Sequence, residues 1–280
     1  MAPNATAADR QPTAVAPRRP ARAMAAAVGT FVLWTAVTYL LEGRLRTLLR
    51  PEAAFDRVTY ALVANVLVGT VLALWVTRWV VLAGHLSPER LGLRSARRTA
   101  LAVVVAGALG GGLFVLQGPP STDVVVVTNA FAQVLVVSIA EVVVCWVLLG
   151  GTVEWALSER TDQRVATVGA SLLASAAFGV YHVAHSPPFN TPAMVGLLTV
   201  VGLGTSLVYF GGRTLYGALV FHNTQALFGV TQALAASGQL AAFETPQVPL
   251  LAMAGFALFV LVVAERTLVR RAASETPTAE

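Results

Sequence analysis

The sequence predicts an all-α protein, a polytopic membrane bundle of about eight transmembrane helices. Two observations favour this fold class. Of the 280 residues, 56% are hydrophobic and only 12% are charged, with a mean hydropathy of +0.71, whereas soluble domains carry about 25% charged residues. Apolar runs of about 20 residues, the length that crosses a bilayer as a helix, also recur along the chain.

These apolar runs define one transmembrane domain over residues 24–271, between tails at 1–23 and 272–280 that we expect to be disordered and cytoplasmic. Eight runs are long enough to span the membrane, at about 24–41, 58–83, 99–117, 124–149, 165–185, 193–211, 214–236 and 248–267.

Three connecting segments have a composition of their own. The stretch "EGRLRTLLRPEAAFDR" between the first two runs indicates an interfacial amphipathic segment, and "HLSPERLGLRSARR" (85–98) indicates a basic loop. The stretch "SPPFNTP" (186–192) contains three prolines, which forbid a continuous helix and predict a turn.

Arginine placement predicts the orientation in the membrane. All 19 basic residues are arginine, and 15 of them fall in inside segments if both termini are cytoplasmic, as the positive-inside rule requires. The other four, Arg44, Arg46, Arg50 and Arg57, fall in the first external loop. We therefore expect a multi-pass cell-membrane protein whose partner is the lipid bilayer. The pI near 10.1 reflects these flanking arginines and indicates no nucleic-acid partner.

A few polar side chains interrupt the apolar runs, and ionisable groups at that depth are costly and commonly functional. They are Glu141 in the fourth run, His182 and His185 at the end of the fifth, and His222 in the seventh, followed by Asn223 and Gln225. Structural interpretations exist for each: Glu141 could pair with a buried donor, His182 or His185 could cap a helix, and His222 could bond between helices.

Together these groups match the chemistry of hydrolysis. A glutamate beside a histidine can hold a water and take its proton, and a second histidine with an amide can stabilise an oxyanion. This set requires no metal. Two histidines and a carboxylate are also a zinc ligand set, although the H-E-x-x-H motif is absent, so the cofactor stays unknown, with zinc as an option.

The order of these residues resembles the CAAX prenyl endopeptidase and bacteriocin-processing (CPBP or Abi) family of intramembrane proteases. "FGVYH", Phe178 to His182, matches the family motif F-x-x-x-H; "FHNTQA" begins the H-x-x-x-N motif at His222; and "IAEVVVCWV" aligns Glu141 with the first glutamate of E-E-x-x-x-R. The resemblance covers about 58–236. It implies a helical core cleaving peptides or membrane proteins without metal, with Glu141 and His182 activating water and His222 stabilising the oxyanion.

The chain departs from the family pattern at three positions: Val142 replaces the second glutamate, Trp146 the arginine and Ala226 the asparagine. Gln225, on the helical face of His222, could replace the missing amide, whereas Asn223 is turned about 100° away. The second glutamate and the arginine of the family motif would form an ion pair, and replacing both by uncharged residues leaves no buried charge without a partner. This pattern is consistent with an active but divergent enzyme and equally with an inactive relative.

Helix depth raises a difficulty for this site. With a rise of about 1.5 Å per residue, the predicted depth of Glu141 and His222 is near mid-membrane. The predicted depth of His182 is roughly 10 Å nearer the external face. The fifth helix would have to begin later, tilt or break for His182 to reach Glu141.

The leading hypothesis is an intramembrane endopeptidase with a glutamate- and histidine-activated water. The alternative is a catalytically inactive relative that acts as a membrane scaffold or binding protein. Two further hypotheses are a rhomboid-like serine protease using Ser171 with His222, and a transporter with Glu141 as a proton relay, for which no repeat symmetry is visible.

Overall fold

The computed structural model describes residues 20–50, 52–83 and 86–275. Helix α1 begins at Pro20 and helix α11 ends at Glu275, so those parts of the two expected tails that fall within the described residues are helical. The remainder of the tails, 1–19 and 276–280, lies outside the described residues.

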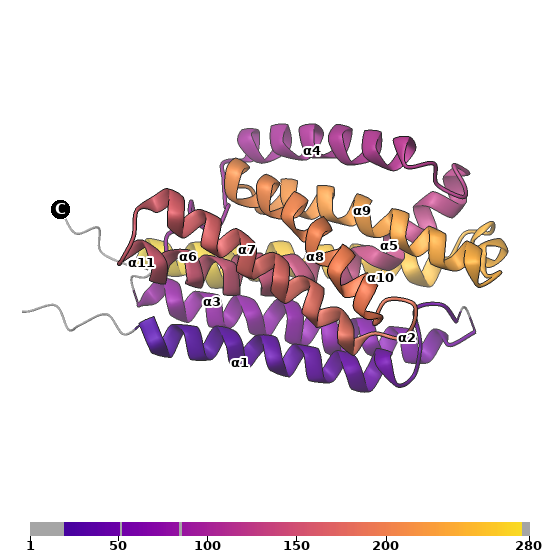
Figure 1. Cartoon of the computed structure of the whole chain (residues 1–280), viewed down its shortest axis with the longest axis horizontal. Coiled ribbons are helices and arrows are strands. Elements are labelled where there is room, and N and C mark those ends of the chain that lie inside the picture. Colours follow the sequence, from indigo (N-terminus) through magenta and orange to yellow (C-terminus); the bar gives the residue numbers. More distant parts are fainter. Residues whose placement is uncertain (1–19, 51, 84–85, 276–280) are drawn as a thin grey trace, which may run out of the picture.

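Every regular element among the described residues is a helix, which confirms the all-α prediction (Figure 1). Eight long helical rods follow one another, some of them divided into α segments and segments with wider π-type or tighter 3₁₀ turns. The rods are α1–η1 (Pro20–Thr38, Tyr39–Gly43), α2–η2–α3 (Ala54–Tyr60, Ala61–Leu72, Ala73–Leu82), α4 (Ala96–Leu116), α5–η3–α6 (Val124–Glu141, Val142–Gly150, Gly151–Ser158), α7–η4 (Gln163–Tyr181, His182–Ala184), α8–η5 (Pro192–Ser206, Leu207–Gly211), α9 (Leu215–Ala236) and α10–η7–α11 (Val248–Ala264, Glu265–Arg270, Arg271–Glu275). A short 3₁₀ turn, η6 (Leu240–Phe243), lies between the last two rods.

The fourth rod is the core of the bundle. Val124–Ser158 is 35 residues long, and 94% of its most apolar 18-residue stretch is buried inside the protein. A helix that is apolar all round must be surrounded by other elements. Helices α7, α9 and α10 and the η2 segment all pack against this rod, so a polar side chain at its centre faces protein, not lipid.

Helix α9 is the least apolar of the eight rods. The other seven are long and apolar enough to cross a membrane, whereas α9 does not meet that test, since its sequence carries His222, Asn223, Thr224 and Gln225 in succession. Helix α4 covers α9 on one side in Figure 1, and α5 packs against it from another direction. The polar helix is thereby shielded by apolar neighbours.

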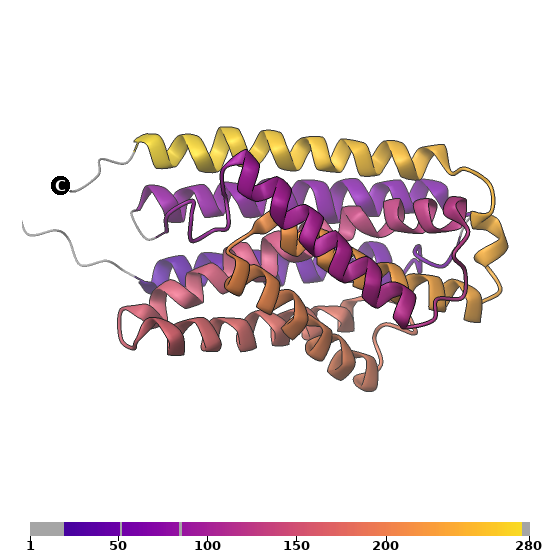
Figure 2. The ribbon, with the colours of Figure 1, turned by 90° about the horizontal axis from the view of Figure 1, so that it is seen from above.

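The loops gather at two opposite ends of the bundle. At one end Arg94 Nε donates a hydrogen bond to the Arg213 carbonyl oxygen, 2.9 Å away, and the Leu215 amide donates to Gly92. Helix α1 begins and α11 finishes at this same end (Figure 2). At the other end Gln133 Nε2 donates to the Leu48 carbonyl oxygen at 2.8 Å.

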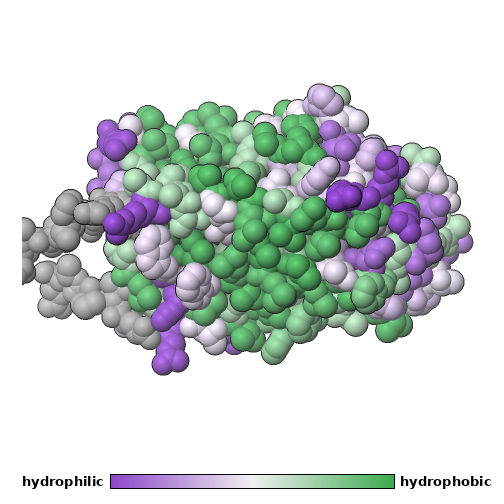
Figure 3. Space-filling model, turned by 90° about the horizontal axis from the view of Figure 1, so that it is seen from below, coloured by the Kyte–Doolittle hydropathy of each residue, from purple (hydrophilic) through white to green (hydrophobic). Residues whose placement is uncertain are grey.

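The outer surface between these ends is apolar. Leu101, Val104, Leu197, Val200 and Phe259 are each more than half exposed. In Figure 3 such residues form a continuous apolar band, with the polar residues concentrated toward the two ends. This distribution is the one that a bilayer environment requires.

The expected amphipathic segment between the first two rods takes a different form. After Gly43 the chain makes two tight turns before α2 begins at Ala54. The turns close on Glu42, whose carboxylate is fully buried and accepts hydrogen bonds from the backbone amides of Thr47 and Leu48. The segment is thus organised around a buried carboxylate and its hydrogen-bond donors, where the charge pattern indicated an interfacial amphipathic segment.

Candidate active site

The structure brings Glu141, His182 and His222 together in the middle of the bundle. Glu141 Oε2 lies 2.9 Å from His222 Nε2, and Glu141 Oε1 lies 3.6 Å from His182 Nε2. The three residues are at most 7% exposed. One carboxylate thus lies between two imidazoles that come from different helices, surrounded by apolar protein.

The expected depth mismatch of His182 is absent, because the fourth helix is longer than its apolar run suggested. The fourth rod continues to Ser158, nine residues beyond the predicted end at 149, and α7 begins at Gln163 after a short turn. Measured from this turn, Glu141 is about 26 Å away and His182 about 29 Å at 1.5 Å per residue. The two residues therefore lie at nearly the same level.

Hydrogen bonds on the far side of each ring fix how the imidazoles face the carboxylate. His182 Nδ1 lies 2.9 Å from the Phe178 carbonyl oxygen, which can only accept, so Nδ1 carries a proton. In the neutral ring, Nε2 then presents a lone pair toward Glu141 Oε1. A water donating one O–H to each of these two atoms would satisfy both.

His222 is held by a second partner that the sequence did not indicate. Its Nδ1 lies 3.0 Å from Thr205 Oγ1 of α8, while its Nε2 faces Glu141. Because both ring nitrogens are bonded, the ring is oriented from two sides. Thr205 is completely buried, and only the packing of α8 against α9 brings it to His222.

His185 joins the same cluster, although the sequence favoured a helix cap. The helix ends in a 3₁₀ turn over His182–Ala184, in which side chains three residues apart eclipse one another. The imidazoles of His182 and His185 are accordingly stacked, with ring centroids 4.9 Å apart and planes 18° from parallel. Neither ring nitrogen of His185 has a hydrogen-bond partner among the described residues, yet the residue is 97% buried.

Glu141, His182 and His185 also form a candidate metal-ligand group. One ligand atom from each lies within 4.8 Å of the others. Zinc bonds to imidazole nitrogen and carboxylate oxygen at about 2.0–2.2 Å, so two ligands of one ion stand about 3.4 Å apart in tetrahedral geometry. The 3.6 Å separation of Glu141 Oε1 and His182 Nε2 fits this spacing, and His185 would have to move closer.

Uncharged side chains occupy the two positions where the resemblance leads one to expect a charge pair. Val142 and Trp146 are both fully buried, and the Trp146 indole N–H donates to Ser206 Oγ at 2.8 Å. The Trp146 ring also packs 5.3 Å from the His222 ring, between centroids. Neither substitution leaves a charge unpaired beside Glu141.

The two amides proposed as oxyanion donors have other partners. Gln225 Oε1 accepts a hydrogen bond from Gln117, the residue directly after α4, at 3.2 Å, and Asn223 Nδ2 donates to the Phe131 carbonyl oxygen at 3.3 Å. Among the described residues neither makes a hydrogen bond to the Glu–His cluster. Ser171, the nucleophile of the serine-protease hypothesis, donates to the Thr167 carbonyl oxygen and makes no described bond to His222.

Comparisons with known proteins identify no relative of this chain. No protein-family model matches the chain, and neither the curated proteins nor the solved structures yielded a match. The class of protein defined by fold and site is therefore a polytopic helical membrane protein with a buried Glu–His cluster.

Proposed function

We propose that this protein is an intramembrane endopeptidase that hydrolyses peptide bonds with water activated by Glu141 and His182. One observation carries the proposal: a carboxylate buried at mid-bundle lies within 3.6 Å of two imidazoles. A general base must lie within hydrogen-bond reach of the proton that it removes, directly or through one water. The resemblance to CPBP proteases points to the same residues.

The proposed reaction starts from a water between Glu141 Oε1 and His182 Nε2. Glu141 removes one proton while the water oxygen bonds to the substrate carbonyl carbon. Protonation of the carboxylate weakens its hold on the His222 N–H, which then donates to the new oxyanion. The C–N bond breaks as Glu141 returns the proton to the leaving amine, so the general base ends the cycle ionised.

Thr205 completes this arrangement as a positioning residue. Its hydroxyl bonds His222 Nδ1, which leaves Nε2 directed at the carboxylate. Since Glu141 is 3% and His222 1% exposed, a substrate reaches the cluster only when covering side chains move. Peptides and membrane proteins already within the bilayer are the substrates that such a buried site favours.

The test uses purified protein in lipid nanodiscs with a peptide library, and mass spectrometry to find new termini. Glu141→Gln keeps the side-chain shape but removes the base, so cleavage should fall by about 10²–10⁴-fold. Glu244→Gln, an exposed glutamate outside the cluster, should cleave like the wild type. No cleavage by the wild type, or equal cleavage by Glu141→Gln, would favour an inactive scaffold or binding protein.

The two unpartnered nitrogens of His185 favour a second candidate, zinc-dependent hydrolysis at the same cluster. Glu141, His182 and His185 would hold the ion, which would acidify a bound water when present. Metal analysis of the purified protein separates the two candidates. Zinc retained by the wild type and lost in His185→Gln supports the second, whereas cleavage that survives exhaustive chelation supports the first.

A further inference from the structure

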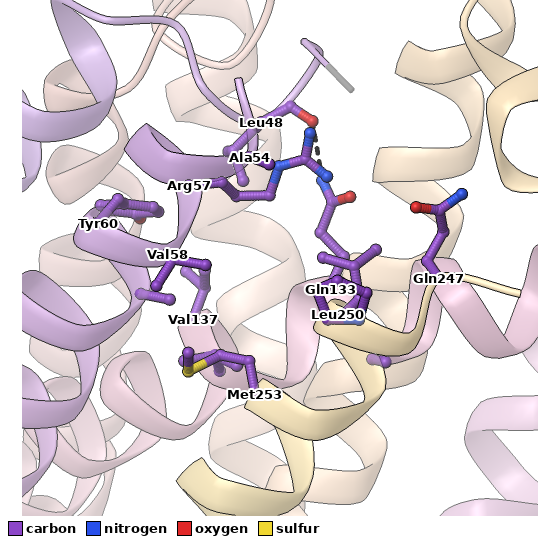
Figure 4. Close-up of a pocket in the computed structure, with 14 residues that line it drawn as sticks. Leu48, Ala54, Arg57, Val58, Tyr60, Gln133, Val137, Gln247, Leu250 and Met253 are labelled. Atoms are coloured by element: carbon purple, nitrogen blue, oxygen red, sulfur yellow. Dashed lines mark hydrogen bonds between the residues drawn. The ribbon is translucent and has the colours of Figure 1, made fainter. Parts of the chain in front are cut away.

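A separate pocket opens at the end of the bundle away from α11, between α2–η2, α5 and α10 (Figure 4). The empty space in the pocket and its open mouth together is about 630 Å³. Its lining residues are Leu48, Ala54, Arg57, Val58, Tyr60, Ala61, Ala132, Gln133, Val136, Val137, Gln247, Pro249, Leu250 and Met253.

The pocket is divided into a polar and an apolar part. In Figure 4 the polar ends of Arg57 and Gln133 lie next to Leu48, Gln247 lies apart from them to the right, and the side chains of Val137 and Met253 lie below. The polar part is next to the loop that follows α1, and the apolar part runs along α5 and α10 toward the bundle interior. A ligand with a polar head and an apolar chain matches this division.

Arg57 supplies the charge that selects the head. Its Nε is buried and has no hydrogen-bond partner in the described part of the chain, where the one bond of this side chain runs from Nη2 to the Arg50 carbonyl oxygen at 2.5 Å. No described carboxylate forms an ion pair with it. A half-buried guanidinium with an unused donor is strongly stabilised by an anion such as phosphate or carboxylate.

Gln133 adds a second unused group to the polar part. Its Nε2 donates to the Leu48 carbonyl oxygen, but its buried Oε1 has no hydrogen-bond partner within residues 20–50, 52–83 and 86–275. A headgroup that combines an anionic phosphate with a free hydroxyl would pair with both Arg57 and Gln133. Phosphatidylglycerol has this chemistry.

The pocket includes one of the four arginines that depart from the positive-inside pattern. Arg57 lines the pocket, whereas Arg44, Arg46 and Arg50 are exposed in the turns on either side of Leu48 and do not line it. Basic side chains at a membrane surface attract anionic lipid headgroups. Of the four arginines, Arg57 is therefore the one placed to bind a headgroup held in the pocket.

From these observations we propose that the pocket binds an anionic phospholipid, with its phosphate at Arg57 and one acyl chain along Val58, Val137 and Met253. The proposal does not depend on the hydrolytic function. The pocket and the Glu–His cluster share no residue. Tyr60 lines the pocket and also contacts the cluster, because the centroid of its ring lies 6.4 Å from that of the His185 ring.

Native mass spectrometry of the protein, exchanged into nanodiscs of phosphatidylcholine with a minor fraction of phosphatidylglycerol, tests this site. The wild type should retain one phosphatidylglycerol in preference to phosphatidylcholine. Arg57→Gln removes a charge-assisted bond and should weaken this retention about 10-fold. Arg44→Gln removes the same charge from an exposed residue that does not line the pocket and should leave the retention unchanged.

A second variant tests the chain-binding part without altering charge. Val58→Trp fills the apolar part and should abolish retention, whereas Val63→Trp, on the same rod but outside the pocket, should not. Free inorganic phosphate should not compete, because it lacks the chain. Equal retention by Arg57→Gln and Arg44→Gln, or no preference of the wild type for phosphatidylglycerol, would overturn the proposal.

Discussion

Four glutamates are buried among the residues that the structure describes, and their partners distinguish one of them. Glu154 is bonded by Arg213, Glu265 by Arg270 and Tyr216, and Glu42 by a serine, a threonine and backbone amides. Glu141 alone of the four has histidine partners. An imidazole can give and take a proton near neutral pH, whereas the partners of the other three cannot, so Glu141 is the glutamate suited to proton transfer.

At this scale the sequence predicted only part of the cluster. Glu141 stood out because no other charge lies near it in the chain, and His182 and His222 because of their motifs. Glu42 did not stand out, since its neighbours in the sequence are arginines typical of solvent. The place of His185 in the cluster depends on a 3₁₀ turn, and that of Thr205 depends on how α8 is rotated about its axis. The pattern of residues specifies neither feature.

Thr205→Val tests whether His222 must be oriented from behind. Valine keeps the shape of threonine but leaves His222 Nδ1 without its partner. Loss of a hydrogen bond of about 1.4 kcal/mol corresponds to a roughly tenfold lower kcat. KM should be unchanged, because Thr205 does not face the substrate. Thr205→Ser retains the hydroxyl and should restore kcat; an unchanged kcat in Thr205→Val would contradict the positioning role.

At the scale of helices, the level of the two histidines depends on where helices end. The apolar run stops at 149, but α6 continues through Thr152 and Glu154 to Ser158, since Glu154 finds Arg213 inside the protein. Judged by hydropathy alone, a glutamate at position 154 indicates that the membrane helix has already ended. The helix types and most spans were predictable from composition, whereas this extension required a tertiary partner.

The turn that carries His182 and His185 is held by its contact with the end of the first rod. Ser186 Oγ donates to Glu42 Oε1 at 2.6 Å, and a Cβ added at Gly43 would lie 2.3 Å from the Ala184 carbonyl oxygen. Gly43→Ala should therefore displace the histidine turn, lower the thermal unfolding temperature and reduce cleavage. Gly29→Ala is the matched control, because a Cβ there has nothing within 4 Å and alanine favours the helix. Equal behaviour of the two variants would contradict the close contact.

At the scale of the whole molecule, one ion pair joins two helical hairpins. Glu154 is 2% exposed and is bonded by both terminal nitrogens of Arg213, whose pKa is raised by those hydrogen bonds. Arg213→Met would leave a buried charge unpaired and should destabilise the fold by about 3 kcal/mol, measured by thermal unfolding in nanodiscs. The exposed pair Arg50–Glu52 is the control: Glu52→Gln should leave the unfolding temperature unchanged. An Arg213→Met protein as stable as the wild type would show that the pair does not join the hairpins.

The orientation predicted from arginine placement is testable with a single introduced cysteine. The native Cys145 is completely buried and should not react with an impermeant maleimide. Thr161→Cys, in the turn after α6, should then be labelled only from the cytoplasmic side, and Thr122→Cys, before α5, only from the opposite side. The reverse labelling pattern would contradict the cytoplasmic placement of both termini.

The most direct test of the central claim is a single-turnover cleavage in H₂¹⁸O, with the new carboxyl terminus analysed by mass spectrometry. The account predicts one ¹⁸O atom in that terminus for the wild-type protein, and no product above background for Glu141→Gln and His182→Ala. Product carrying ¹⁸O at the wild-type rate in Glu141→Gln would show that another group activates the water, and the Glu141 site would have to be abandoned.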